Sequence, residues 1–346
     1  MKSSSSPLRV AVIGGGNGIP NVLRGLAALA RLGRPFSITA IVATADDGGS
    51  SGRIRSQRGG LPPGDLRNCL LALADDAEGP VGRLFSHRYA GAGDLAGHSL
   101  GNLLLMALAE QEGCYLKAVE AAGRMLRTRG RVLPASTSAL RLEGETVTGE
   151  HISGESRIGA APAAIRRVWL EPAAAEAGDG VVHALQTADL VVLGPGSLFT
   201  SILPVLLVSG VAEAVRASRG TRVLVANLMT QPGETVGMTM ADHLDALDRH
   251  AGPGLVDTVL LNATTIARQR LAPYAEQQAE LVSRAGLAGR PEIMKEAPLV
   301  NASGKIRHDP ARLAEALILI APSVAEAPAP ARHAPAVSPP GGSFAR

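Results

Sequence analysis

Two glycine-rich stretches close to the N-terminus combine residue types that bind phosphate groups. The first, Gly14-Gly15-Gly16-Asn17-Gly18, follows the apolar run at residues 10–13 and precedes a stretch with helical apolar spacing. Glycine lets a ligand approach the backbone closely, and the free N–H groups of a helix N-terminus favour negative charge. The loop therefore predicts phosphate or ribose contacts from Gly15, Gly16, Asn17 and Gly18. It matches neither the dinucleotide fingerprint nor the P-loop, so a tight turn without a ligand stays open as the alternative.

The second stretch places two carboxylates ahead of a glycine and serine loop. Residues 45–53 read Ala-Asp-Asp-Gly-Gly-Ser-Ser-Gly-Arg and follow the apolar run at residues 37–44. We expect Asp46 and Asp47 to accept a ligand hydroxyl or to hold a Mg²⁺ ion that bridges a diphosphate. The residues expected to contact and neutralise the phosphates are Gly48, Ser50, Ser51 and Arg53. A solvated acidic turn is the alternative.

Two predicted helix starts carry further polar residues. Asp65 follows a double proline, and helix capping alone explains an acid in a first turn. Arg67 and Asn68 lie on the polar side of the same helix, where we expect them to face a cleft. At the next helix start, His98 and Asn102 lie four residues apart on one face, although a structural role explains the lone histidine equally well.

Two later loops repeat the order of apolar strand, polar loop and helix. The first interrupts a charge-free run at residues 190–212, and the second follows the apolar run at residues 222–228. Glycine and proline break the charge-free run, so we expect a strand, a loop and a buried helix there rather than a membrane span. The predicted ligand contacts of these loops are Gly194, Gly196, Ser197, Thr200, Asn227 and Thr230. Since the carboxyl ends of parallel strands meet at one edge, the four polar loops are expected to form one crevice.

The elements that position these loops alternate between strand and helix patterns, which predicts a doubly wound α/β fold with a mostly parallel, Rossmann-like sheet. Strands are expected at residues 9–13, 37–44, 190–193, 222–228 and 258–262. Two helices with apolar spacing i, i+3, i+4, i+7 are expected to pack on the sheet. Their apolar residues are Leu66, Cys69, Leu70 and Leu73 in the first, and Leu100, Leu103, Leu104 and Ala107 in the second.

The expected domain organisation is one α/β domain at residues 9–321 with a small β-rich insertion at about residues 131–170. A turn at Glu143-Gly144-Glu145 is expected within the insertion. Residues 1–8 are expected to be a flexible N-terminus. Residues 322–346 contain six prolines in 25 residues and predict a disordered, Pro/Ala-rich tail.

Composition narrows the function classes. The chain has 34 Lys and Arg against 31 Asp and Glu, and only 2% aromatic residues, which argues against a nucleic-acid-binding surface. Its two cysteines, Cys69 and Cys114, have no partners at zinc-ligand spacing, and the N-terminal apolar run is too short for a signal peptide. We therefore expect a cytoplasmic protein with no membrane span.

In addition, the sequence resembles the YvcK family of gluconeogenesis factors, which belongs to the superfamily of the phospholactate transferase CofD. The resemblance covers about residues 10–319 and rests on the loops above and on Arg307-His308-Asp309-Pro310, all in the same order along the chain. It implies a protein that binds UDP-sugars and supports cell-wall morphogenesis and cell shape on gluconeogenic carbon sources. On this basis Arg307 and His308 are expected to close over the ligand from the C-terminal segment.

The leading hypothesis is therefore a UDP-sugar-binding regulator whose partners act in cell-envelope synthesis, with a homodimer left open. The first alternative is a Mg²⁺-dependent CofD-like transferase of a group linked to a nucleotide diphosphate. Its candidate catalytic groups are Asp47 near the metal and Asp65 or His98 as base. An NAD-binding oxidoreductase is the second alternative, and a scaffold that acts through protein contacts alone is the third.

Overall fold

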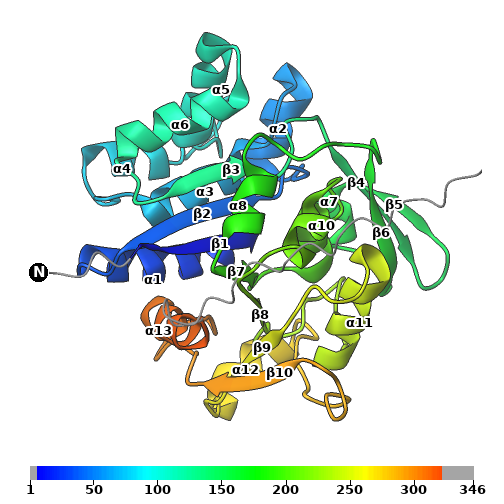
Figure 1. The fold of residues 1–346 in the computed structure, drawn as a ribbon. Helices are drawn as coiled ribbons and strands as arrows, with labels where there is room; N and C mark the ends of the chain where they lie inside the picture. The colour runs from blue at the N-terminus through cyan, green and yellow to red at the C-terminus, as the bar shows by residue number, and fades with distance from the viewer. Residues whose placement is uncertain (1–5, 322–346) are drawn as a thin grey trace, which may run out of the picture.

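The computed structural model describes residues 6–321, so the predicted tail at residues 322–346 and the first five residues of the predicted N-terminal segment lie outside the described residues. A seven-stranded sheet forms the centre of the molecule, in the order β10-β9-β8-β7-β1-β2-β3 (Figure 1). Every neighbouring pair in this sheet is parallel. The strands are β1 (Leu8–Gly14), β2 (Phe36–Val42), β3 (Arg131–Pro134), β7 (Leu190–Leu193), β8 (Thr221–Val225), β9 (Thr258–Asn262) and β10 (Ile293–Ala297).

The central strands are apolar on both faces, as strands of a covered parallel sheet must be. In β1, Val10 and Val12 belong to one buried cluster and Ala11 and Ile13 to another. Such alternation follows from the two-residue repeat of a strand. Two hydrophobic layers therefore sandwich the sheet, which confirms the predicted doubly wound fold.

Helices cover both faces. One layer contains residues of α1 (Ile19–Arg31), α3 (Pro63–Leu73), α5 (Leu100–Glu112), α6 (Tyr115–Leu126) and α13 (Pro310–Ile320). The other contains residues of α8 (Val181–Thr187), α9 (Leu203–Leu206), α10 (Val211–Arg216) and α11 (Met240–Ala251). Phe85 of α4 (Pro80–Ser86) also belongs to the first layer, and Ile158 of α7 (Glu155–Ile158) and the π-helical turn at Leu198–Ile202 belong to the second. The remaining helices are α2 (Gly49–Arg58) and α12 (Arg268–Ala275).

One of the two predicted sheet-packing helices differs from expectation. All four apolar residues predicted for α3 are buried. In α5 the buried residues are instead Gly101, Asn102 and Leu105, while the predicted face at Leu100, Leu103, Leu104 and Ala107 is only partly covered or exposed. The prediction was wrong because α5 packs mainly on α6 and α4 and turns Asn102 toward a buried polar network.

The predicted β-rich insertion is a three-stranded antiparallel sheet in the order β5-β4-β6, at one side of the molecule beside α7 (Figure 1). Its strands are β4 (Arg141–Thr146), β5 (His151–Ser153) and β6 (Ile165–Glu171). The turn predicted at Glu143-Gly144-Glu145 is wrong, because these residues lie within β4 and Gly144 pairs with Val168 and Ile152. The chain turns at Gly149, which has a positive φ. Strand β3, inside the predicted insertion range, belongs to the main sheet.

The contact between α1 and α13 depends on Gly25. A Cβ atom at this position would lie 2.0 Å from the Pro310 carbonyl oxygen and 2.8 Å from the Ala314 Cβ. We therefore expect Gly25→Val to lower the free energy of unfolding by about 2–3 kcal/mol, as overpacking does. Urea unfolding measures the effect. The control Ala28→Val adds the same side-chain type on an exposed position of the same helix, and an equal loss in both variants would contradict a role for the close approach.

Candidate functional site

The crevice of this fold lies where the strand order reverses direction. Strands β1 and β7 are neighbours in the sheet but far apart in the sequence, and the chain leaves β1 toward β2 on one side and continues from β7 toward β8 on the other. Ligands of open α/β sheets bind outside the carboxyl ends of the strands at such a switch point. A cavity of about 510 Å³ opens there, between the loops that follow β1, β7 and β8.

The structure brings many of the predicted ligand residues together around this cavity. They are Gly15, Gly16, Asn17, Gly18, Gly196, Ser197, Thr200, Asn227, Thr230, Arg307 and His308. Asn227 lies in the loop rather than in a strand, because β8 ends at Val225 instead of at residue 228 as predicted. Other lining residues come from segments without a predicted motif: Glu155 from α7, Tyr274 from α12, and Gln277 and Ala279 just after α12.

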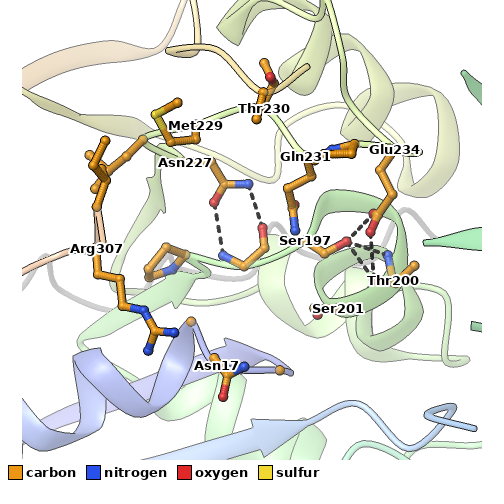
Figure 2. A pocket seen from close by; sticks show the side chains of 18 of the residues that line it. Asn17, Ser197, Thr200, Ser201, Asn227, Met229, Thr230, Gln231, Glu234 and Arg307 are labelled. Atoms are coloured by element: carbon orange, nitrogen blue, oxygen red, sulfur yellow. Dashed lines mark hydrogen bonds between the residues drawn. The ribbon is translucent and has the colours of Figure 1, made fainter. Parts of the chain in front are cut away.

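Two of the loops touch each other at Gly18. A Cβ atom on Gly18 would lie only 1.8 Å from the Pro195 carbonyl oxygen. Next to this contact, the Asn227 side chain holds Gly196 by two hydrogen bonds, one accepted from the Gly196 N–H at 3.1 Å and one donated to its carbonyl at 2.8 Å (Figure 2). Glycine at position 18 thus allows the first and third polar loops to touch, and Asn227 ties the third loop to the fourth.

A buried carboxylate uses the hydroxyl groups of the third loop. Ser197 Oγ donates to Glu234 Oε2, and the Thr200 hydroxyl lies 2.7 Å from Ser197 Oγ and 3.2 Å from Glu234 Oε1 (Figure 2). Burial raises the pKa of Glu234 above its ordinary value, although these hydrogen bonds oppose the shift. The hydroxyls of Ser197 and Thr200 therefore line the cavity but are already hydrogen-bonded to an acidic side chain, so this side is polar and acidic.

The opposite side of the cavity is cationic. Figure 2 shows the Arg307 side chain extending toward Asn17, which lies in the glycine loop just before α1. Arg24 on α1 is close enough for its charge to interact with that of Arg307. Of the predicted pair, only Arg307 is exposed; His308 is buried in the wall, and burial lowers its pKa to about 4. His308 is therefore neutral at physiological pH.

The remaining predicted residues lie outside the cavity lining. They are Asp46, Asp47, Gly48, Ser50, Ser51, Arg53, Asp65, Arg67, Asn68, His98, Asn102 and Gly194. Asp65 is the link to the cavity, since its Oδ2 accepts a 2.6 Å hydrogen bond from the Gly16 N–H. Burial raises the pKa of Asp65 to about 6. The Gly16 N–H predicted to meet a phosphate is thus occupied by a carboxylate of the protein.

His98, a candidate catalytic base, belongs to a buried network. Its Nδ1 lies 3.1 Å from Ser50 Oγ, which also accepts a 3.1 Å hydrogen bond from Asn102 Nδ2. Arg67 donates to the Asn102 side-chain oxygen at 2.8 Å and to the neighbouring Asn68 side chain. All members except Asn68 are buried, so the geometry favours the structural role for His98.

The predicted Mg²⁺ ligands Asp46 and Asp47 offer the carboxylate oxygens that this ion prefers. Within residues 6–321 no three His, Cys, Asp or Glu side chains are grouped closely enough to hold a metal ion by themselves. Asp46 Oδ1 accepts from the Gly48 N–H at 2.9 Å, and Asp47 Oδ1 from the Ser156 N–H at 2.8 Å. The Ser51 side chain also hydrogen-bonds Asp46, whereas one oxygen of Asp47 lies outside these hydrogen bonds. The two carboxylates fit a Mg²⁺ ion that takes its other ligands from phosphate and water, which is the usual manner of Mg²⁺ binding.

Acidic groups crowd the boundary between this pair and the cavity. Burial raises the pKa of Glu155 to about 8, helped by the charges of Asp46, Asp47, Asp65 and Glu234. The pKa of Glu155 is thus higher in the folded than in the unfolded protein. The protein therefore loses stability as the pH rises from 4.5, the unfolded pKa, through about 8, the folded one.

Replacement of Glu155 by glutamine is therefore expected to stabilise the protein at alkaline pH. Relative to wild type, we expect Glu155→Gln to raise the free energy of unfolding by about 2 kcal/mol at pH 8.5 and by almost nothing at pH 5. Urea unfolding at the two pH values measures this, with Glu150→Gln on the exposed turn of the small sheet as control. The same difference between Glu155→Gln and wild type at both pH values would contradict the pKa shift.

The charge-free run at residues 190–212 forms β7, the π-helical turn and α9, with buried side chains through most of its length. No helix among residues 6–321 has both the length and the apolar character needed to cross a membrane.

Comparisons with known proteins agree with this architecture. The family model described as 2-phospho-L-lactate transferase CofD matches residues 10–293. The gluconeogenesis factor of Listeria monocytogenes is 40% identical over 323 residues, which cover 93% of this chain and 98% of that protein. The gluconeogenesis factor of Bacillus subtilis is 40% identical over 317 residues, covering 90% and 97%. A crystal structure of a protein from Bacillus halodurans superposes with a TM-score of 0.86 at 40% identity, covering 90% of this chain and all of that one.

Proposed function

Because the chain belongs to the CofD family and, within it, to the gluconeogenesis factors, we propose that its cavity binds a nucleotide diphosphate sugar, and a UDP-sugar in particular. The observation that carries the proposal is the position of the cavity. It lies at the switch point of the sheet and is bounded by the N-terminus of α1 and by Arg307. A helix N-terminus and a guanidinium group both favour a phosphate.

The dimensions and chemistry of the cavity support a ligand of this class. Its volume of about 510 Å³ lies within the range of small-molecule sites. The walls offer a phenol at Tyr274, amides at Asn17 and Gln277, and a guanidinium at Arg307. A nucleotide sugar has a planar base, two phosphates and several hydroxyls. The phenol can contact the base, the guanidinium the phosphates, and the amides the hydroxyls.

Isothermal titration calorimetry with UDP-N-acetylglucosamine tests the proposal. We expect saturable binding with one site per chain and a dissociation constant in the micromolar range. Uridine, which lacks the diphosphate, serves as the control and is expected to bind at least tenfold more weakly, because it makes no contact with the cationic side. No heat of binding at millimolar UDP-N-acetylglucosamine would remove the proposal.

The biological part of the proposal is a regulatory role. A cytoplasmic protein that binds a UDP-sugar without consuming it reports the supply of cell-wall precursors, and such a reporter suits a factor that supports cell shape on gluconeogenic carbon sources. Its partners would be regulators of cell-envelope synthesis, and a homodimer remains a prediction. A deletion strain complemented by a variant that cannot bind UDP-sugars is expected to keep its shape defect; full complementation would contradict the role.

A CofD-like transferase is the second candidate, and one observation favours it. Asp46 and Asp47 lie beside the cavity, linked to it by Asp65 and Glu155, and they fit a Mg²⁺ ion. When bound, that ion would neutralise the charge of a departing diphosphate. Asp65, with a pKa of about 6, could accept a proton from an acceptor alcohol. Metal-dependent consumption of a nucleotide-linked donor that is lost in Asp47→Asn would establish this function.

An NAD-binding oxidoreductase gains no support, since Asp46, the carboxylate expected to bind the ribose hydroxyls, lies outside the cavity lining.

A further inference from the structure

The cavity is electrostatically polarised, and its two ends come from different parts of the chain. The cationic end consists of the N-terminus of α1 and Arg307, with Arg24 nearby. No acidic residue occurs in the first turn of α1, so the N-terminal end of the helix dipole is not compensated from within the helix. This end of the cavity therefore attracts an anion.

The acidic end consists of Glu155 from the insertion and Glu234 from the loop after β8. The two side chains lie on converging segments, since a Cβ atom on Gly159, just after α7, would lie 3.7 Å from Glu234 Oε1. Behind them lie Asp46, Asp47 and Asp65, whose charges act on Glu155. Arg55 is the basic side chain on the far side of this group, where it interacts with Asp46 and Asp47 rather than with the two cavity residues.

The two ends are separated across the cavity. In Figure 2, Arg307 and Asn17 lie on one side of the labelled residues, while Glu234 and Thr200 lie on the other, with Asn227 and Ser197 between them. Any elongated ligand with one strongly anionic part therefore has a preferred direction. The diphosphate lies toward Arg307, and the far part of the ligand meets the carboxylates.

We propose that this polarity makes the site selective for sugars without a negative charge, so that a hydroxyl-bearing UDP-hexose is accepted and the corresponding UDP-uronic acid is rejected. This inference rests on the proposed function and names the class of sugar that the same site takes. Hydroxyl and amide groups of a neutral sugar can donate hydrogen bonds to Glu155 and Glu234. A uronate carboxylate can only accept hydrogen bonds, and it adds another negative charge to the group.

Carboxyl groups line and back this end of the cavity. Burial raises the pKa of Glu155 to about 8, and the charges of Asp46, Asp47, Asp65 and Glu234 add to the shift. A uronate placed there would meet the same neighbouring charges, and above pH 8 it would also face an ionised Glu155. Like-charge contacts of this kind cost several kcal/mol in protein interfaces, and partial exposure reduces the cost. We expect a discrimination of roughly 10- to 100-fold in the dissociation constant.

UDP-glucose and UDP-glucuronic acid are the matched probes, because they share the nucleotide, the diphosphate and the sugar stereochemistry and differ only at the C6 substituent. Both are titrated by calorimetry at pH 9, where Glu155 is ionised, in a buffer without divalent cations, so that no metal ion masks the carboxylates. We expect UDP-glucose to bind 10- to 100-fold more tightly. In Glu155→Gln the ratio is expected to fall by at least fivefold, mainly through tighter binding of UDP-glucuronic acid. Glu234→Gln, which keeps a hydrogen-bonding side chain beside Ser197 and Thr200, is expected to act in the same direction.

The control variant and the outcomes separate this inference from the proposed function. Glu150→Gln removes an exposed carboxylate of the same insertion outside the cavity and is expected to leave the ratio unchanged. Equal affinity for the two sugars, tighter binding of UDP-glucuronic acid, or a ratio that Glu155→Gln and Glu234→Gln both leave unchanged would overturn the inference while leaving the proposed function intact. Failure of wild type to bind either sugar would instead remove the proposed function itself.

Discussion

Arg307→Glu is expected to weaken the binding of UDP-N-acetylglucosamine at least 100-fold without unfolding the protein. Arg307 is exposed at the cavity rim and makes no ion pair among the described residues, so its guanidinium is free for a ligand. Reversal of its charge removes a partner of the diphosphate and adds a repulsive one next to the N-terminus of α1. A charge-assisted pair in a partly enclosed site contributes about 2–5 kcal/mol, which corresponds to a loss of this size. Calorimetry measures the affinity, and a melting curve verifies the fold.

Lys305→Glu is the matched control for this charge reversal. Lys305 is exposed, lies two residues away on the same segment, and does not line the cavity. Its replacement changes the net charge of the protein by the same amount, so a purely long-range effect would appear in both variants. Unchanged affinity in Arg307→Glu, or an equal loss in Lys305→Glu, would contradict a direct contact between Arg307 and the ligand.

Gly18→Ala is expected to weaken the binding of UDP-N-acetylglucosamine at least 100-fold, although it adds only one methyl group. The new Cβ atom would lie 1.8 Å from the Pro195 carbonyl oxygen and 2.9 Å from the Gly196 Cα, and both neighbours are backbone atoms that no side-chain rotation can move. The first and third loops must therefore separate, which displaces Asn17 and the N-terminus of α1 from the rest of the cavity. Loss of an aligned site of this kind costs 100-fold or more in affinity.

Calorimetry and thermal melting together test the Gly18→Ala prediction. Gly237→Ala serves as the control, because Gly237 lies in the loop between β8 and α11 and a Cβ atom there meets nothing within 4 Å. Because Gly237 has a positive φ, alanine at this position is slightly strained. The control therefore accounts for the general loss of stability when a loop glycine is replaced. Wild-type affinity in Gly18→Ala would show that the two loops need not touch for the ligand to bind.

The sequence was sufficient for the fold and for the position of the crevice, because both depend on short-range patterns. The apolar run at residues 190–193 is strand β7, and the glycine loop after β1 leads directly into α1. Parallel strands bring their carboxyl ends to one edge, so loops far apart in sequence converge once the strands are identified. The turn at Glu143-Gly144-Glu145 was misplaced, because a glycine within a strand looks like a turn residue unless the packing of Ile158 against it is known.

The finer chemistry of the site could not be read from the loops alone. Ser197 and Thr200 look like phosphate ligands in the sequence, but their hydroxyls are engaged by Glu234, which lies more than 30 residues away. The same holds for Gly16, whose N–H is bonded to Asp65. Glu155 and Tyr274 belong to no motif and reach the cavity only through the packing of α7 and α12. Such contacts depend on which residues lie close together in the folded protein, and spacing along the chain does not reveal this.

A structure of the protein with bound UDP-N-acetylglucosamine tests the central claim most directly. We predict that the diphosphate lies between Arg307 and the N-terminus of α1 and that the sugar hydroxyls face Glu155 and Glu234. A ligand bound on another surface of the protein, or a diphosphate placed against the carboxylates without a metal ion, would contradict the account.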